Sequence, residues 1–416
     1  MKLFTLLATL FALAHSKGVS VKTLDEKFGK VIYVNIIYRH GDRTPIKSYP
    51  NDPYKYLYFW PVDWGQLTNE GKLHQYHLGQ WLRSRYRDLF SNRGYDHKTI
   101  YILSTDVDRA LMSAQANAAG MFPVGPNDRW SNIDWQPIPI HSIPEHLDKF
   151  LTMKVPCKQY DSLFIEFMQS EEMERIKDKY KQILSYMSNH TGDNMTVGKT
   201  ENLYTTLLIE KLANLTLPGW TNEVFPDILQ EIAGINFSIY TYTKELRRLR
   251  GGPLLTKILS FFHDKLNSKF RQFRNITIFS AHDTTISAFL STVGIFNSLP
   301  PPFSSTVMVE LRMSKNNEPL VTILYKNTTH EEPHLLTVPG CEEACPLKKI
   351  MQLLEPVLPV DWDSECSGGK SAHKFTDTSI FYTMLTVISI LLVALSYCWH
   401  RNRLYFWNNG GYENLK

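Results

Sequence analysis

The chain has 416 residues, of which 43% are apolar and 21% are charged. This length fits one large α/β domain or two smaller domains, and the composition is ordinary for a globular protein. The formal net charge of +4 gives no sign of the strongly basic surface that nucleic-acid binding requires.

Residues 1–16 form a predicted secretory signal peptide. Lys2 precedes the apolar run LFTLLATLFALA, and the small residues Ala14 and Ser16 suit a cleavage after Ser16. A buried N-terminal helix is the alternative. The pattern favours a chain that enters the secretory pathway.

Strand and helix patterns then alternate up to about residue 140. The apolar run VIYVNII at 31–37 has strand length, and residues 65–90 have helical spacing with Thr68 or Asn69 as the cap. HKTIYILSTD predicts a second strand, and VDRALMSAQANAAGMF predicts a helix rich in small residues. Such alternation is typical of a parallel sheet covered by helices on both faces.

The pattern changes between about residues 140 and 255. Charged residues become dense and strand signals fade, as in EFMQSEEMERIKDKYKQILSYM, which predicts an inserted cap of helices. NITIFSAHDTT restores the strand-then-turn pattern, and SSTVMVELRM and LVTILYKN form a predicted hairpin. The expected fold class is α/β, with a mainly parallel sheet flanked by helices and a helical cap domain.

A second apolar segment, residues 378–399, contains no charged side chain. At ~1.5 Å per residue, a helix of this length crosses a ~30 Å hydrocarbon layer. Arg401 and Arg403 follow it, and basic residues mark the cytoplasmic side. The sequence therefore predicts a single-pass type I membrane protein, with residues 17–377 in the lumen or outside the cell and residues 400–416 in the cytosol.

Cysteines and glycan acceptors before this segment fit an oxidising compartment. The four cysteines permit two disulfides, and the residues alone allow three pairings. They are Cys157, Cys341, Cys345 and Cys366. Six N-x-S/T sites precede the segment and none follows it. They are Asn189, Asn194, Asn214, Asn236, Asn275 and Asn327.

The cytoplasmic tail contains Tyr412-Glu-Asn-Leu415, a tyrosine-x-x-bulky-apolar pattern. Patterns of this kind are typical of sorting signals that bind adaptor proteins, and a chance match in an exposed tail is the alternative. The two expected locations are the lysosomal or endosomal membrane and the plasma membrane.

Polar side chains follow three predicted strands at the point where each strand ends. In chain order they are Arg39, His40 and Arg43, then Arg109, then His282 and Asp283. If these strands are parallel neighbours, the six side chains meet beyond the carboxyl edge of the sheet, where α/β proteins bind ligands. Surface ion pairs would explain each group alone, but they explain the joint pattern poorly.

Such a cluster suits a phosphate group. Three arginines stay charged and repel one another unless an anion lies among them. A histidine among them has a lowered pKa, so its neutral imidazole can attack phosphorus and form a phosphohistidine. The arginines then stabilise the charge on the phosphoryl oxygens. Asp283 is the candidate proton donor, because a neighbouring phosphate dianion would raise the pKa of its carboxyl.

RHGDRTP and, far downstream, SAHDTT resemble the histidine acid phosphatase family, the RHG-motif branch of the phosphoglycerate-mutase-like superfamily. The likeness extends over about residues 31–366 and includes GQLTNEGKLHQYHLGQWLRSRY, STDVDRALMSAQANAAGMFP, RLRGGPLL and LPGCEEACPL. These stretches look most like the prostatic and lysosomal branch of that family.

The resemblance implies a role for each cluster residue, with His40 as nucleophile and Asp283 as proton donor. It implies that the phosphate ligands are Arg39, Arg43, Arg109 and His282. It also implies an α/β core with a helical cap, no metal or other cofactor, small phosphate monoesters as substrates, and a homodimer. The disulfides that it implies are Cys157–Cys366 and Cys341–Cys345.

Three other readings share parts of the pattern. An enzyme specific for a lysophospholipid, a nucleoside monophosphate or a phosphotyrosine would carry the same motifs. A phosphomutase would share the pocket, but the predicted leader and membrane segment count against it. A receptor ectodomain without catalysis would be expected to have a broken motif, and all six positions are intact.

Overall fold

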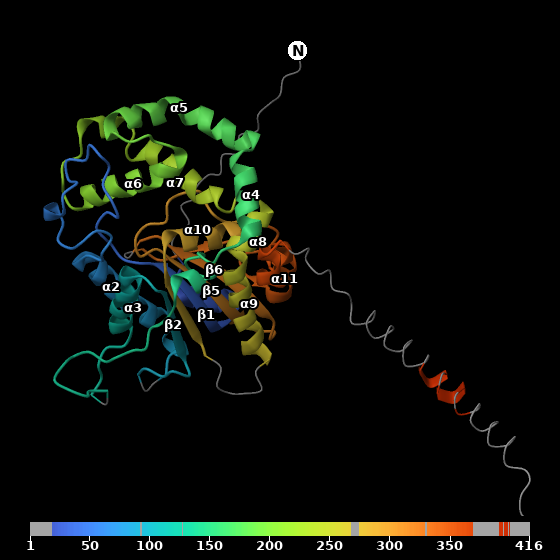
Figure 1. Ribbon diagram of the computed structural model, residues 1–416. Helices are drawn as coiled ribbons and strands as arrows, with labels where there is room; N and C mark the ends of the chain where they lie inside the picture. Colours follow the sequence, from blue (N-terminus) through green and yellow to red (C-terminus); the bar gives the residue numbers. More distant parts are fainter. Residues whose placement is uncertain are drawn as a thin grey trace, which may run out of the picture. The chain divides into compact units, whose positions relative to one another are not determined.

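The computed structural model describes residues 19–91, 94–126, 128–267, 274–328 and 331–368, together with 391–393, 395–397 and 399. The chain separates into two compact units, Met1–Ser367 and Gly368–Lys416. The labelled helices and strands of Figure 1 belong to the first unit.

The predicted signal peptide and the predicted sorting signal at Tyr412 and Leu415 lie outside the described residues. Most of the predicted membrane segment, 378–399, also lies outside them, and its described positions are helical. Across the described ranges, no helix is both long enough and apolar enough to span a membrane.

One sheet carries the strands of the first unit, in the order β3–β2–β4–β1–β5–β6–β7, with β8 beside β6. Their bounds are β1 (Lys30–Arg39), β2 (Ile100–Thr105), β3 (His141–Ile143), β4 (Ile276–Ala281), β5 (Thr306–Met313), β6 (Pro319–Lys326), β7 (His334–Leu336) and β8 (Cys345–Pro346). Strands β3, β2, β4 and β1 are parallel, whereas the pairs from β1–β5 onward are antiparallel.

The sheet is therefore mixed, and the prediction of a mainly parallel sheet was wrong in this respect. The predicted hairpin is present as β5 and β6. Its turn is closed by a hydrogen bond from the Ser314 amide to the Glu318 carbonyl (2.9 Å). So short a connection joins only antiparallel neighbours, and the hairpin adds its strands to the β1 side of the parallel half.

The helices lie on both faces of the sheet and in a separate cap (Figure 1). They are α1 (Val21–Phe28), α2 (Asn69–Arg85), α3 (Asp108–Met121), α4 (Lys158–Met168), α5 (Glu171–Thr191), α6 (Val197–Leu212), α7 (Asp227–Ile239), α8 (Lys244–Arg250), α9 (Gly252–Asn267), α10 (Asp283–Thr292), α11 (Leu347–Leu354) and α12 (Trp362–Cys366). Short 3-10 turns are η1 (Leu57–Phe59), η2 (Arg87–Leu89), η3 (Glu145–Leu147), η4 (Gly219–Glu223) and η5 (Glu355–Val357).

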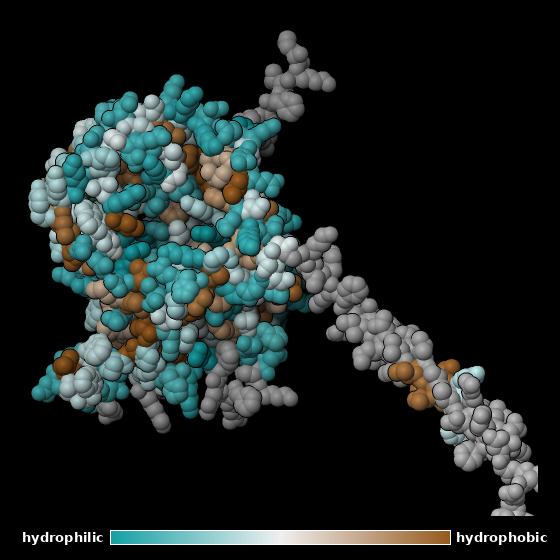
Figure 2. Space-filling model, viewed as in Figure 1, coloured by the Kyte–Doolittle hydropathy of each residue, from teal (hydrophilic) through white to brown (hydrophobic). Residues whose placement is uncertain are grey.

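The predicted glycan acceptors differ in accessibility. The face of the first unit in Figure 2 is largely hydrophilic, with scattered hydrophobic residues. Asn189, Asn194 and Asn214 are exposed. Asn275 donates to the Leu89 carbonyl (2.9 Å) and accepts from Lys265 (2.7 Å) through its side-chain amide, so this amide is already engaged.

Asn236 is the buried one among the predicted glycan acceptors. The residue is only 6% exposed, in helix α7. A glycan there would have to leave the interior of the folded cap, so this position does not suit modification. The sequence motif reports the acceptor tripeptide, whereas burial depends on how α7 packs against α6.

The cap comprises α4 to α8 and has its own hydrophobic core, which includes Leu207, Leu229, Ile232 and Leu246. Strand β3, which follows the expected start of the cap near residue 140, pairs with β2 in the main sheet. Strand β3 was missed because three residues are too few to show a periodic pattern.

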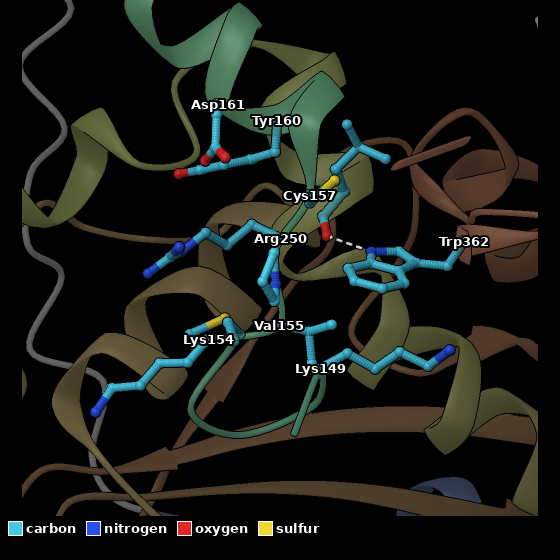
Figure 3. Close-up of a pocket in the computed structure, with 11 residues that line it drawn as sticks. Lys149, Lys154, Val155, Cys157, Tyr160, Asp161, Arg250 and Trp362 are labelled. Atoms are coloured by element: carbon cyan, nitrogen blue, oxygen red, sulfur yellow. Dashed lines mark hydrogen bonds between the residues drawn. The ribbon is translucent and has the colours of Figure 1, made fainter. Parts of the chain in front are cut away.

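The C-terminal end of the first unit is fastened to the cap at three points. The disulfide Cys157–Cys366 joins the start of α4 to α12, with 4.6 Å between the Cα atoms. Arg248 binds Glu365 through two hydrogen bonds (2.7 and 2.8 Å). The indole of Trp362 donates to the Leu249 carbonyl (2.8 Å), beside a hollow of about 310 Å³ (Figure 3). The second disulfide, Cys341–Cys345, lies just before α11, so both pairings implied by the resemblance are present.

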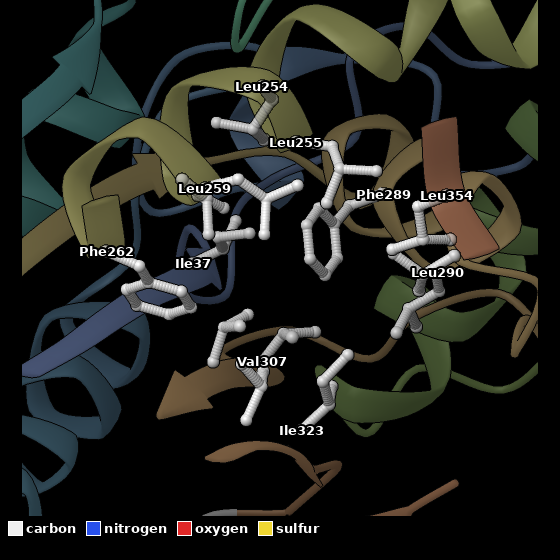
Figure 4. Packing of buried hydrophobic residues seen from close by; sticks show 14 of the residues in the cluster. Ile37, Leu254, Leu255, Leu259, Phe262, Phe289, Leu290, Val307, Ile323 and Leu354 are labelled. Carbon is white, nitrogen blue, oxygen red and sulfur yellow. The ribbon is translucent and has the colours of Figure 1, made fainter. Parts of the chain in front are cut away.

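Two apolar layers enclose the sheet. On one face, Leu255 and Phe262 of α9 and Phe289 of α10 pack against Ile37 and Val307 of the strands (Figure 4). The other face is covered by α1, α2 and α3. Helices α2 and α3 approach so closely that a Cβ atom on Gly79 would lie 2.0 Å from the Asn117 carbonyl oxygen. The close packing of α2 against α3 stabilises these two helices, which support the predicted site.

A buried pair of carboxyl groups links the cap to the loop that follows β1. Glu210 of α6 is 0% exposed and Asp52 is 2% exposed. The two carboxyl groups interact, and the charge of Asp52 disfavours a second negative charge on Glu210. Burial, followed by the charge of Asp52, raises the pKa of Glu210 from 4.5 to about 9.

This pair contributes stability to the fold at acidic pH. Folding raises the pKa of Glu210, so the folded state binds a proton more tightly than the unfolded state. The contribution of Glu210 to the free energy of unfolding should then fall as pH rises above 4.5, until the group ionises near pH 9. Glu210→Gln should flatten this fall by roughly 1 kcal/mol per pH unit between pH 5 and pH 8. Urea unfolding at several pH values measures it, with Glu223→Gln, on the cap surface, as the control. An unchanged pH slope would contradict the prediction.

Candidate active site

The six predicted side chains lie together beyond the carboxyl ends of β1, β4 and β2. These strands are adjacent and parallel, and Arg39 pairs with Ala281 while Ser104 pairs with Ser280. The chain therefore leaves all three strands at nearly the same level. The converging groups are Arg39, His40, Arg43, Arg109, His282 and Asp283.

The loop after β1 packs directly on the first turn of α2. The Gly41 amide also donates to the hydroxyl of Ser113 on α3 (3.0 Å). A Cβ atom at Gly41 would lie only 2.3 Å from the Gly71 carbonyl oxygen, so any other residue would push the loop away from α2. Glycine at this position keeps His40 in place.

The hydrogen bonds of His40 define its tautomer. Its Nδ1 lies 2.8 Å from the Gly41 carbonyl oxygen, which can only accept, so Nδ1 carries the proton. The Nε2 atom then has a lone pair, and it accepts a hydrogen bond from Nε of Arg109 (3.1 Å). Burial, followed by the charge of Arg39, lowers the pKa of His40 well below 6.5. The neutral imidazole therefore presents a nucleophilic nitrogen within the arginine cluster.

Arg39 and Arg43 are both buried. Arg39 donates to the Pro301 carbonyl (2.7 Å), and its guanidinium carbon lies 4.0 Å from the centre of the Phe303 ring. The Nε atoms of Arg39 and Arg43 are buried and have no hydrogen-bond partner among the described residues. Burial and the charge of Arg39 lower the pKa of Arg43. Buried donors without partners suit an anion with several oxygen acceptors.

His282 and Asp283 stand at the start of α10. The His282 imidazole Nε2 lies 3.1 Å from the Thr105 hydroxyl, and its backbone amide donates to Thr285 (3.3 Å). Burial, followed by the charge of Arg109, lowers the pKa of His282 to about 3, so this imidazole is neutral.

Asp283 forms an ion pair with Arg39, with 2.7 Å between Oδ2 and the guanidinium nitrogen. Its Oδ1 accepts from the Thr284 amide (2.8 Å). Burial alone would raise the pKa of Asp283, but Arg39 and Arg43 outweigh burial and lower it. The predicted rise in this pKa therefore requires a bound phosphate dianion that competes for the arginines.

Arg109 does not have the simpler role of an ion pair with Asp106 or Asp108. It is the second residue of α3, and its Nε donates to His40. No ion pair of Arg109 occurs among the described residues. Its charge is therefore free to meet a ligand.

Sequence reasoning missed several residues that shape the site. Phe303 covers Arg39 and lies 5.9 Å from the His40 ring, centre to centre. Gln75 of α2 donates to the Arg39 carbonyl (2.9 Å) and to Ser304 (3.0 Å). Thr105, at the end of β2, could have been inferred from its place at a strand end. Phe303 and Gln75 carried no such signal, because both approach the site from elsewhere in the chain.

Comparisons with known proteins agree with this arrangement. The family model of the histidine phosphatase superfamily (branch 2) matches residues 30–326. Lysosomal acid phosphatase of Rattus norvegicus is 37% identical over 370 residues, covering 87% of this chain and 86% of that protein. Prostatic acid phosphatase of Bos taurus is 38% identical over 355 residues, covering 84% of this chain and 90% of that protein.

Solved structures extend the likeness to the fold. The phytase of Hafnia alvei in complex with tartrate has a TM-score of 0.63 at 16% sequence identity, covering 80% of this chain and 98% of that one. The apo form of this phytase has a TM-score of 0.61. The family match spans the loop after β1, the start of α3 and the start of α10, which together hold all six cluster residues. The chain belongs to the histidine phosphatase superfamily, branch 2.

Proposed function

We propose that this chain is an acid phosphatase that hydrolyses phosphate monoesters through a phosphohistidine at His40. The observation that carries the proposal is the Nε2 lone pair of a neutral His40, held among three arginines. Relatives that are 36–38% identical over most of the chain are named acid phosphatases, which supports the same reaction.

In the first half of the reaction, the substrate phosphate replaces Asp283 as the partner of Arg39. Its oxygens accept hydrogen bonds from Arg39, Arg43, Arg109 and His282. Nε2 of His40 then attacks phosphorus, a P–N bond forms, and the P–O bond to the alcohol breaks. Asp283 gives its proton to the leaving oxygen, so an alcohol rather than an alkoxide departs.

In the second half, water hydrolyses the phosphohistidine. Asp283, now ionised, takes a proton from the water as its oxygen attacks phosphorus and the P–N bond breaks. Inorganic phosphate leaves, and both His40 and Asp283 return to their starting states. The arginines stabilise the phosphoryl oxygens in both steps.

A phosphate-release assay on the purified protein tests the proposal. The panel contains an aryl phosphate, a nucleoside monophosphate, a lysophospholipid phosphate and a phosphotyrosine peptide, each near pH 5 and pH 7, with and without a chelator. We expect turnover that is faster near pH 5 and unaffected by the chelator. Absence of phosphate release, or a requirement for metal, would contradict the proposed reaction. Turnover of one substrate alone would favour a substrate-specific relative.

We also propose that the enzyme works in the secretory pathway, anchored by residues 378–399, with its catalytic domain in the lumen or outside the cell. The two disulfides and the lysosomal and prostatic names of its relatives support this location. A homodimer, glycans at the exposed acceptors Asn189, Asn194 and Asn214, and adaptor binding through Tyr412 and Leu415 complete the proposal.

A further inference from the structure

Gln75 of α2 ties the end of β1 to the segment that precedes β5. Its side-chain Nε2 donates to the Arg39 carbonyl (2.9 Å) and to the Ser304 hydroxyl (3.0 Å). A carbonyl oxygen can only accept, so the nitrogen end of the amide must face Arg39. Gln75 is 0% exposed, and its backbone carbonyl accepts from the side-chain amide of Asn117 on α3 (3.2 Å). The residue is therefore anchored on one side by two helices and bonded on the other side to the site.

Residues 301–305, the 301–305 segment, contact Arg39 at three points. The Pro301 carbonyl accepts from Nη1 of Arg39 (2.7 Å), and the Ser305 carbonyl accepts from the Arg39 amide (3.0 Å). The ring of Phe303 has its centre 4.0 Å from the guanidinium carbon of Arg39. The direction of this guanidinium group thus depends on where the 301–305 segment lies.

The 301–305 segment needs hydrogen bonds to stay in place. Ser304 has a φ of 60°, in the left-handed region that residues other than glycine seldom adopt. Phe303 lines a cavity of about 460 Å³, so space lies beside the ring that covers Arg39. The Ser304 amide donates to the His40 carbonyl (3.2 Å), and Gln75 holds the hydroxyl of the same residue. These two bonds keep the strained residue against the loop that carries His40.

The other end of the Gln75 amide also indicates a functional role. Its Oε1 is buried and has no hydrogen-bond partner among the described residues. A buried acceptor without a partner costs stability, and an apolar side chain of the same size would avoid that cost. Costs of this kind are commonly retained at functional sites. What glutamine supplies at this position is a pair of N–H donors for two acceptors.

We propose that Gln75 is a positioning residue for phosphoryl transfer, which holds the 301–305 segment so that Arg39 and His40 are aligned with the bound phosphate. This inference rests on the proposed function. The reaction needs Nε2 of His40 in line with the bond that breaks, and it needs Arg39 against the phosphoryl oxygens. Without the donors of Gln75, Phe303 can move into the cavity and Arg39 can turn away, so both attack and charge stabilisation weaken.

The test compares Gln75→Met with Gln75→Glu in the full-length protein. Both replacements have about the size of glutamine, but methionine has no donor, and a carboxyl donates only while it carries a proton. The measurements are kcat and KM for 4-nitrophenyl phosphate from pH 4 to pH 8, and inhibition by inorganic phosphate. Each value is divided by the wild-type value at the same pH, so that the titration of His40 and Asp283 cancels.

With Gln75→Met, we expect the relative kcat to fall about 10-fold or more at every pH, and inorganic phosphate to inhibit about 10-fold more weakly. With Gln75→Glu, the relative kcat should be several-fold above that of Gln75→Met at pH 4, because the protonated carboxyl replaces one donor. This advantage should disappear as pH rises and the carboxyl ionises. A role in packing alone would give no such pH-dependent rescue.

Two further variants make the outcome specific. Gln80→Met, on the exposed face of α2, should retain the wild-type values. Ser304→Ala removes one acceptor, so it should lower kcat and weaken phosphate inhibition by less than Gln75→Met does. Added to Gln75→Met, it should cost little more, because the bond that it removes is already absent. If Gln75→Met does not fold, Ser304→Ala alone decides, and wild-type values in that variant would overturn the inference.

Unchanged kcat and phosphate inhibition in Gln75→Met would also overturn the inference. So would equal losses for Gln75→Met and Gln75→Glu at every pH, which would mean that glutamine only fills space. If His40→Ala still turned over the ester, the proposed function itself would fail, whatever the Gln75 result.

Discussion

His40→Ala should lower kcat for an aryl phosphate by about 10⁴-fold or more, since removal of a covalent nucleophile commonly costs that much. The structure gives the reason in two contacts. The Gly41 carbonyl oxygen accepts a hydrogen bond from Nδ1 of His40. Nε2 of His40 therefore has the lone pair, and it lies beside Arg109 within the arginine cluster. The other neutral histidine of the cluster, His282, contacts the Thr105 hydroxyl rather than an arginine through its Nε2.

Phosphate release by wild-type and variant enzyme measures this effect, and His77→Ala, on the exposed face of α2, is the matched control. Alkaline denaturation during turnover, followed by mass spectrometry, should detect a phosphoryl group on the peptide that contains His40. Activity within 10-fold of wild type in His40→Ala, or a phosphoryl group on another residue, would remove the phosphohistidine from the mechanism.

Asp283→Asn should slow alkyl phosphates by about 10²- to 10⁴-fold, the range that general acid catalysis commonly contributes. Aryl phosphates should lose much less, because an aryl oxide leaves without a proton. Asparagine can keep the contact with the Thr284 amide through its side-chain oxygen, so the change removes the acid with little effect on the start of α10.

The measurement is kcat for a series of esters whose alcohols differ in acidity, with Asp161→Asn, an exposed carboxylate at the start of α4, as the control. The loss should grow as the alcohol becomes less acidic. Since the neutral amide of the Asp283→Asn variant cannot form an ion pair with Arg39, the empty site would also be more positive, and phosphate should inhibit the variant more strongly at neutral pH. A uniform loss across the series would exclude Asp283 as the proton donor.

The strand-end pattern was the most informative part of the sequence. VIYVNII, TIYILST and NITIFSA were predicted as strands, and each is a strand followed by polar residues. Their convergence depended on one condition, that the strands be parallel neighbours, and the pairing of β4 with both β1 and β2 fulfils it. The Thr68 cap of α2 was also predictable, and its hydroxyl accepts from the Gly71 amide (3.1 Å).

Other features depended on contacts that no local pattern records. The parallel fraction of the sheet was overestimated, because the order of strands is set by long-range pairing rather than by apolar runs. Asn236 carries a glycosylation tripeptide, yet α7 buries it. Glu210 looks like an ordinary charged residue of a helix, but it is 0% exposed and interacts with Asp52.

By itself, the sequence determined the chemical groups of the site, the cysteine content and the α/β alternation, because these follow from residue identity and short-range periodicity. Only the tertiary structure decided the ionisation of those groups. The tautomer of His40 and the ion pair of Asp283 with Arg39 arise where β1, α3 and α10 meet. Protonation depends on burial and on charges a few ångströms away, and those neighbours come from positions far apart in the chain.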